Sequence, residues 1–187
     1  RVACDDYDQD RLRRFLDAPA ERRRADAAVA LGGLGDARSV PKLLDLLEDE
    51  EGLVRVAARW ALERLSRLRL GEQPAEWSAW HAGELTWEER ERPGLEAALF
   101  EPDSARVVEA LMELSHHPLY RHELCALLAP LAADERAEVA VAACATLTRL
   151  ESLAGASGLI AGLESRTDEV HDAAWRALKK ITGRVLP

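Results

Sequence analysis

Apolar and small residues recur along this chain in one nine-residue pattern, in which a Val is followed by a pair of Ala and closed by a Leu. The pattern occupies residues 54–62 and returns at 139–147 and 170–178. Its apolar positions fall at offsets 0, 3, 4, 7 and 8 from the leading Val, and these offsets share one face of an α-helix. Small Ala side chains on that face let neighbouring helices approach closely. The pattern therefore predicts helices that stack as repeats.

The closing leucines of these segments give the length of the repeat. Leu31 and Leu62 are 31 residues apart, and so are Leu147 and Leu178. Longer steps on either side of Leu111 locate an insertion after Leu62 and a longer unit before Leu147. We predict about five helix pairs, each with a first helix, a short acidic turn and a second helix that carries the pattern. The many Ala and Leu residues favour helices over strands, so we expect an all-α fold.

Two prolines bear on where the first helices begin and end. Pro41 fits the first position of a helix, where its missing N–H costs nothing. Pro130 lies inside a helical pattern. We expect it to kink or shorten that helix, because it removes one backbone hydrogen bond.

The nine-residue pattern, together with segments 31–36 and 177–183, resembles the HEAT repeats of bacteria, in the subgroup similar to phycobilin-lyase subunits. The resemblance covers residues 21–70 and 93–183. It implies a right-handed α-solenoid whose second helices line a concave groove. The predicted domains are an N-terminal capping segment at 1–20, HEAT-like repeats at 21–70, a tryptophan-containing helical insertion at 71–92, and HEAT-like repeats at 93–187.

The insertion carries three of the tryptophans, Trp77, Trp80 and Trp87. The first two are three residues apart and share a helix face, while Thr86 with Glu89 is typical of a capping box that begins another short helix. One interpretation is an aromatic platform for a partner. We favour the other, in which the tryptophans pack the insertion against the repeats, because a short helix of this kind needs an apolar surface on which to rest.

The charge of the chain bears on its partners. A net charge of -9 disfavours binding to nucleic acid or to an anionic membrane. The arginines among residues 1–24 are interspersed with acidic residues, a pattern that favours a salt-bridged helix face over a nucleic-acid-binding arm. No apolar run is long enough to span a membrane.

The cysteines bear on the compartment. Cys4, Cys125 and Cys144 lie far apart in the sequence, which favours a reducing compartment and predicts a cytoplasmic location. The chain begins at Arg1 without a methionine, and residues 2–4 are similar to the end of a lipoprotein signal. Secretion or lipid anchoring therefore stays an open alternative.

The most informative candidates for binding are two tryptophans in the second helices. Trp60 and Trp175 stand at offsets 6 and 5, outside the buried stripe, with charged residues beside them. Tryptophan and arginine together are typical of interaction surfaces. The predicted partner-binding groove consists of Arg55, Arg59, Trp60, His171, Asp172, Trp175 and Arg176. The alternative is that each tryptophan lies flat against the next repeat.

Other reactive residues do not form a convincing site. His116, His117, His122 and Cys125 lie within ten residues, but a metal site needs three or four converging ligands, so we interpret this segment as a turn between helices. Nothing near Cys144 in the sequence would lower the pKa of its thiol. No glycine-rich phosphate loop or nucleophile motif is present. We predict no catalytic residue, no metal and no cofactor.

The predicted function is a non-catalytic protein-binding scaffold whose concave groove holds a peptide or a partner domain, in a monomer or weak dimer. Three alternatives stay open. The resemblance to phycobilin-lyase subunits implies an accessory subunit that binds a small ligand. A resemblance to HEAT-like DNA-repair glycosylases implies a groove that grips a duplex. A third possibility is a structural module inside a longer polypeptide.

Overall fold

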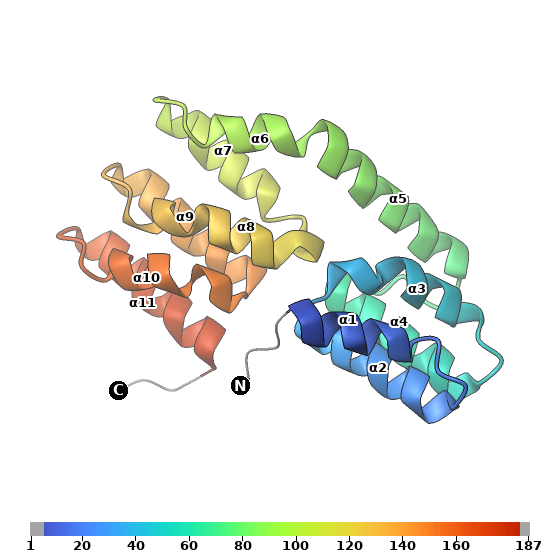
Figure 1. Cartoon of the computed structure of the whole chain (residues 1–187). Helices are drawn as coiled ribbons and strands as arrows, with labels where there is room; N and C mark the ends of the chain where they lie inside the picture. Colours follow the sequence, from blue (N-terminus) through green and yellow to red (C-terminus); the bar gives the residue numbers. More distant parts are fainter. Residues whose placement is uncertain (1–5, 184–187) are drawn as a thin grey trace. The chain divides into compact units, whose positions relative to one another are not determined.

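The computed structural model describes residues 6–183, and this range contains eleven α-helices and no β-strand (Figure 1). The all-α prediction is therefore confirmed. The chain divides into two compact units, Arg1–Leu85 and Thr86–Pro187. Each unit is described by itself.

The first unit contains two helix pairs and the beginning of a longer helix. Its α-helices are α1 (Asp6–Phe15), α2 (Glu21–Leu34), α3 (Val40–Asp45), α4 (Gly52–Ser66) and the start of α5 (Pro74–Arg90). Short 3-10 turns, η1 (Ala37–Ser39) and η2 (Leu46–Glu48), flank α3. Helix α1 packs on α2, and α3 packs on α4.

The second unit contains three helix pairs. Its α-helices are α6 (Arg92–Ala98), α7 (Ser104–Leu114), α8 (Arg121–Leu128), α9 (Ala137–Leu150), α10 (Ala156–Gly162) and α11 (Asp168–Thr182). Three 3-10 turns accompany them: η3 (Pro118–Tyr120), η4 (Ala129–Ala133) and η5 (Leu153–Gly155). The second helices α7, α9 and α11 lie side by side (Figure 1). With the two pairs of the first unit, the prediction of about five helix pairs is confirmed.

The repeated pattern forms the core, as its spacing predicts. The five pattern positions of segment 54–62, at offsets 0, 3, 4, 7 and 8, are all buried on α4. Helices α2 and α4 cross closely at Gly32, where an added Cβ would lie 2.7 Å from the Cβ of Ala61. In the second unit, Gly158 of α10 lies directly against the backbone of Ala129 in η4. Small residues at these crossings allow backbones to approach.

Pro130 has the expected effect on its helix. Helix α8 ends at Leu128, and the chain continues as the 3-10 turn η4, in which Pro130 occupies an early position. The reason is the missing N–H of proline, which cannot bond to the preceding turn of an α-helix.

The insertion differs from the prediction in one respect. Residues 74–90 form the single helix α5, so no new helix begins at Thr86. A Thr followed three residues later by a Glu caps a helix only where the Thr has extended backbone geometry. Here Gly83 is the only weak helix former nearby, and one interior glycine costs only about 1 kcal/mol. The helix therefore continues through it.

Two aspartates hold the turns that precede second helices. Asp49 accepts hydrogen bonds from Nε and Nη2 of Arg24, both at 2.8 Å, and from the backbone N–H of Glu51 at 3.0 Å. Asp134 accepts in the same way from the side chain and the N–H of Arg136. Arg136 also donates to the carbonyl of Glu101 at 3.0 Å. The Arg24–Asp49 ion pair and the Arg136–Glu101 hydrogen bond each tie a turn to the preceding repeat.

The same contacts predict how stability depends on pH. The hydrogen bonds from arginine lower the pKa of Asp49 and of Asp134. An aspartate whose pKa is lower in the folded state stabilises the fold at pH values above its pKa in the unfolded chain, which is about 3.9. This stabilisation is lost as the pH falls through the pKa of the folded state. We expect the urea midpoint to fall steeply below about pH 4. The Asp49→Asn, Asp134→Asn variant should start lower at neutral pH and show a flatter decline. An equally steep decline in the variant would contradict this assignment.

Candidate functional site

The seven predicted groove residues lie on two helices in different units. Arg55, Arg59 and Trp60 belong to α4 of the first unit, while the other four belong to α11 of the second unit. Each helix is therefore a separate candidate surface, and the grouping of all seven residues in one groove stays a prediction.

Two of the α4 residues are engaged within the first unit. Arg55 donates to the backbone carbonyls of Asp49 at 2.7 Å and Glu50 at 2.9 Å. Arg59 donates to a carboxylate oxygen of Glu72 at 2.6 Å, in the segment that leads into α5. Both arginines therefore hold neighbouring loops in place.

Trp60 lies in an exposed apolar row that the sequence analysis missed. Leu53 is 52% exposed, Val56 is 56% exposed and Trp60 is 40% exposed. Their spacing of three and then four residues places them on one face of α4, opposite the buried stripe. We call these three residues the α4 stripe. The signal in the sequence was the presence of large apolar residues at offsets -1 and 2, outside the repeated pattern.

The surroundings of the α4 stripe are partly apolar and partly charged. Gly32 of α2 packs on Ala61 of α4, and Val29 lies one turn before Gly32 on α2. Val29 is itself exposed. The guanidinium of Arg64 lies 5.8 Å from the centre of the Trp60 ring, within the range of a cation–π interaction.

Trp175 occupies a different position of the repeat from Trp60. The residue at offset 7 of a second helix faces the second helix of the preceding repeat. In α4 this residue is Ala61, which packs on Gly32 of α2. In α9 it is Thr146, whose hydroxyl donates to the carbonyl of Leu111 in α7. The residue at offset 5 lies two positions before the residue at offset 7. Two positions correspond to a rotation of about 200° around the helix, so the residue at offset 5 faces the following repeat. In α9 that position is the fully buried Cys144, and in α11 it is Trp175, which is half-buried.

The remaining α11 residues make local polar contacts. The Nδ1 of His171 lies 3.4 Å from a carboxylate oxygen of Asp172, and Arg176 donates to the carbonyl of Asp172 at 3.1 Å. None of the large exposed apolar side chains of the described chain lies on α11. This helix therefore presents a mostly polar surface with one partly covered tryptophan.

The tryptophans of the insertion support the packing interpretation. Trp77 is fully buried, and its indole N–H donates to the carbonyl of Gly71 at 3.1 Å. Its ring meets the half-buried Trp80 edge-on. In the second unit, Trp87 is buried and stacks on His117, with ring centres 3.5 Å apart.

The residues of the candidate metal cluster have separate partners. His117 stacks on Trp87, His122 shares a 2.8 Å hydrogen bond with Ser152, and His116 lies 3.2 Å from the guanidinium of Arg149. Among residues 6–183 no three His, Cys, Asp or Glu side chains are grouped so that they could hold a metal ion.

The described cysteines are buried thiols. Cys125 and Cys144 are both free and buried. Burial raises the pKa of the Cys144 thiol to about 11, because the thiolate is poorly solvated there. Cys144 is therefore a packing residue rather than a nucleophile, and Cys4 lies outside the described residues.

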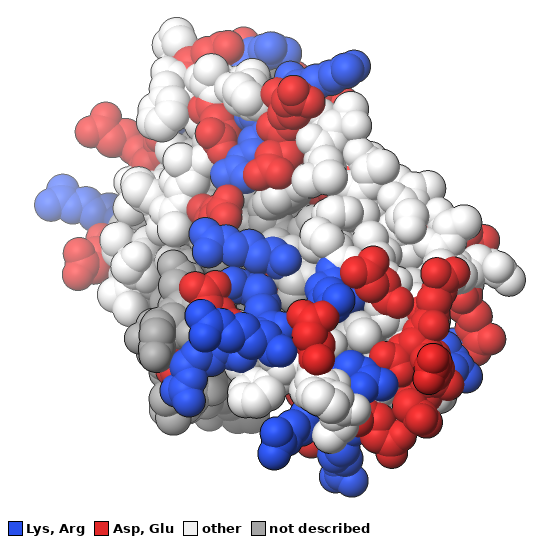
Figure 2. Space-filling view, turned by 45° about the vertical axis from the view of Figure 1, so that its right-hand side comes forward, with Lys and Arg blue, Asp and Glu red and all other residues white. Residues whose placement is uncertain are grey.

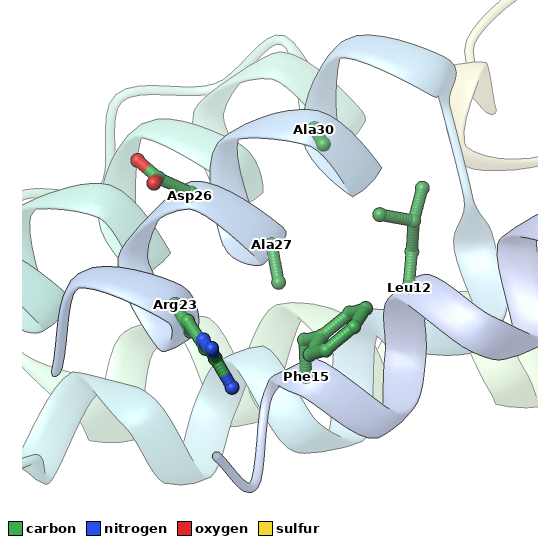
Figure 3. Close-up of a pocket in the computed structure, with 6 residues that line it drawn as sticks. All are labelled: Leu12, Phe15, Arg23, Asp26, Ala27 and Ala30. Carbon is green, nitrogen blue, oxygen red and sulfur yellow. The ribbon is translucent and has the colours of Figure 1, made fainter. Parts of the chain in front are cut away.

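A surface cavity of about 550 Å³ lies between α1 and α2 in the first unit. Leu12 and Phe15 point from α1 toward Ala27 on α2, with Arg23 and Asp26 at the rim (Figure 3). Asp26 forms an ion pair with Arg22 at 3.6 Å. The cavity has the size of a small-ligand site, but no set of polar groups converges in it to orient a ligand.

Charge is unevenly distributed over the surface. On the face drawn in Figure 2, acidic side chains gather at the lower right, while elsewhere basic and acidic side chains are interspersed. In the first unit, the turn before α4 contributes Glu48, Glu50 and Glu51, while the last turn of α4 and its cap contribute Arg64 and Arg67 beside one acidic residue, Glu63. The two ends of α4 therefore differ in the sign of their charge.

Comparison with protein families assigns the repeat. Residues 23–49, from α2 to η2, match the family described as PBS lyase HEAT-like repeat. The chain therefore contains a HEAT-like repeat. The match to this HEAT repeat and the stacked helix pairs agree with the resemblance drawn from the sequence. A comparison with curated proteins finds no match.

Solved structures similar to this HEAT-repeat protein include two engineered proteins and one human enzyme. The first engineered protein is 20% identical, with a TM-score of 0.41, over 93% of this chain and 79% of that one. The second is 21% identical, with a TM-score of 0.40, over 94% of this chain and 48% of that one. Human deoxyhypusine hydroxylase, solved with glycerol, is 19% identical, with a TM-score of 0.31, over 95% and 85%. No described helix of the HEAT-repeat protein is long and apolar enough to cross a membrane.

Proposed function

We propose that this HEAT-repeat protein is a non-catalytic protein-binding scaffold and that the α4 stripe is its main contact surface. One observation supports the proposal most strongly: Leu53, Val56 and Trp60 are exposed together on one helix face. Keeping three large apolar side chains in water forgoes the stabilisation that burial would bring. A partner that covers them recovers it.

The chemistry of the stripe suits a peptide or the surface of a protein domain. Tryptophan is enriched among residues that dominate binding energy, especially where neighbouring contacts exclude water around it. Val56 and Leu53 extend the apolar row, and Arg64 supplies a charged edge beside the ring. A Trp60→Ala change should therefore cost about 2 kcal/mol or more of binding free energy.

The proposed site contains fewer of the residues that were predicted to form the groove. Trp60 stays in the site and is joined by Leu53 and Val56, whereas Arg55 and Arg59 act by fixing the loops beside α4. The four α11 residues form a second, more polar surface. We place no small ligand in the cavity between α1 and α2, and no nucleic acid on α4, where two of the arginines are bound to local acceptors. We further propose a cytoplasmic protein that is a monomer or a weak dimer.

A site-specific photo-crosslinker tests this function in the source cells. A benzophenone amino acid replaces Val56 in one variant and Arg166 in a control, since Arg166 is exposed in the turn before α11. Both variants are first checked for wild-type circular dichroism. We expect a discrete crosslinked protein at position 56 that disappears when Trp60→Ala is added. The same crosslinked products at positions 56 and 166, or none at position 56, would overturn the proposal.

A further inference from the structure

Charged side chains lie at both ends of the α4 stripe, and the net charges of the two ends are opposite in sign. Leu53 adjoins Glu50 and Glu51 in the turn before α4, whereas Trp60 is followed by Glu63, Arg64 and Arg67, which together carry one net positive charge. The row of apolar side chains therefore runs from an acidic end to a basic end. Its length from residue 53 to residue 64 is about 16 Å, or three helical turns.

Several carboxylates lie close together at the acidic end of the α4 stripe. A hydrogen bond between the carboxyl groups of Glu21 at the start of α2 and Glu51 before α4, together with their mutual repulsion, raises the pKa of Glu51. Arg24 is committed to Asp49 and to the carbonyls of Ala18 and Pro19. Glu21 and Glu51 thus lie where an added cation would relieve a repulsion.

At the basic end of the α4 stripe, a positive charge is available to pair with a partner. Arg64 contacts the face of the Trp60 ring and forms no ion pair within the described chain. An acidic side chain placed over this end could pair with Arg64 while an apolar side chain of the same partner covers the ring. One ionic contact and one apolar contact would then set the direction in which the partner lies along α4.

Resting on the proposed function, we infer that the partner segment is an amphipathic helix that lies antiparallel to α4, with acidic residues in its first turn and basic residues in its last turn. Its apolar face would cover Leu53, Val56 and Trp60. Its acidic first turn would lie over Arg64, and its basic last turn over Glu50 and Glu51. Acidic residues at the start and basic residues at the end also stabilise a helix by themselves, so this pattern suits both folding and docking of the segment.

Helix polarity decides between the two possible directions. A parallel helix would need basic residues in its first turn and acidic residues in its last, a pattern that destabilises the helix through its own dipole. The antiparallel arrangement also sets the dipoles of the two helices in opposition. The charges of α4 therefore favour one direction over the other.

Two yeast-displayed libraries of helical peptides, about four turns long, test the inference. Both randomise the apolar positions. The first has acidic residues in the first turn and basic residues in the last, and the second has these charges exchanged. Each library is selected on the full chain and screened against the Trp60→Ala variant. We expect binders that depend on Trp60 from the first library, with affinities about tenfold above those of their charge-exchanged versions.

A double charge swap provides the matched control. The Arg64→Glu, Glu50→Lys variant keeps the formal net charge at -9, so any change in preference comes from the arrangement of charge. We expect this variant to prefer the charge-exchanged peptides. Equal binding of both peptide forms, with both dependent on Trp60, would overturn the inferred polarity and leave the proposed function standing. A failure to obtain any binder that depends on Trp60 would overturn both.

Discussion

Replacing Trp77 with alanine should cost about 3–5 kcal/mol of the free energy of unfolding, the largest effect expected for a single substitution in this chain. Trp77 is the largest fully buried side chain, and its indole N–H donates to the carbonyl of Gly71. The alanine variant leaves a cavity of indole size and an unpaired carbonyl at the start of the insertion. Urea unfolding followed by circular dichroism measures the change.

Trp80 is the matched control for Trp77. It lies three residues away on the same helix, its ring meets that of Trp77, and it is only partly buried. A Trp80→Ala change should therefore cost clearly less, about 1–2 kcal/mol. Equal losses for the two variants would show that the insertion has no packed core around Trp77, contrary to the structure described above.

A single added methyl group at Gly158 should also strongly destabilise the second unit. Its Cβ would lie 1.8 Å from the carbonyl oxygen of Ala129 and 2.7 Å from the Ala129 Cα. These are backbone atoms, so no side chain can rotate to make room, and α10 must move away from η4. We expect Gly158→Ala to cost about 3 kcal/mol, measured as the shift in the urea midpoint at constant slope.

Gly94 of α6, in the same unit, separates this clash from the ordinary effect of glycine in a helix. An added Cβ at Gly94 meets no atom within 4 Å. Gly94→Ala should therefore raise stability slightly, by about 0.5–1 kcal/mol, because alanine is the better helix former. A Gly158→Ala variant as stable as the wild type would mean that α10 does not pack on η4 as described.

The fold could largely be predicted because its core is a periodic pattern. Offsets 0, 3, 4, 7 and 8 define a single helix face whatever the neighbouring helices are, so the buried positions of α4 follow directly from segment 54–62. The break expected at Thr86 was wrong because a capping motif is short and also occurs inside helices. Only the backbone geometry of the residue before a helix distinguishes the two cases.

The candidate site could be predicted only in part. The exposure of Trp60 follows from its offset, and Leu53 and Val56 could have been recognised by the same argument. The roles of Arg55 and Arg59 could not, because they depend on where the carbonyls of the α3–α4 turn and the carboxylate of Glu72 lie in space. The difference between Trp60 and Trp175 depends on which side of each second helix meets the next repeat.

Fluorine NMR tests the central claim, that the α4 stripe is the surface on which partners bind. The chain is labelled with 5-fluorotryptophan, and single Trp→Phe variants assign the resonances of its five tryptophans. Peptides without any designed charge pattern are selected on the wild-type chain and added to it. We expect the Trp60 resonance to shift or broaden while those of the buried Trp77 and Trp87 stay in place. Binding that moves the Trp175 resonance and leaves that of Trp60 unchanged would contradict it.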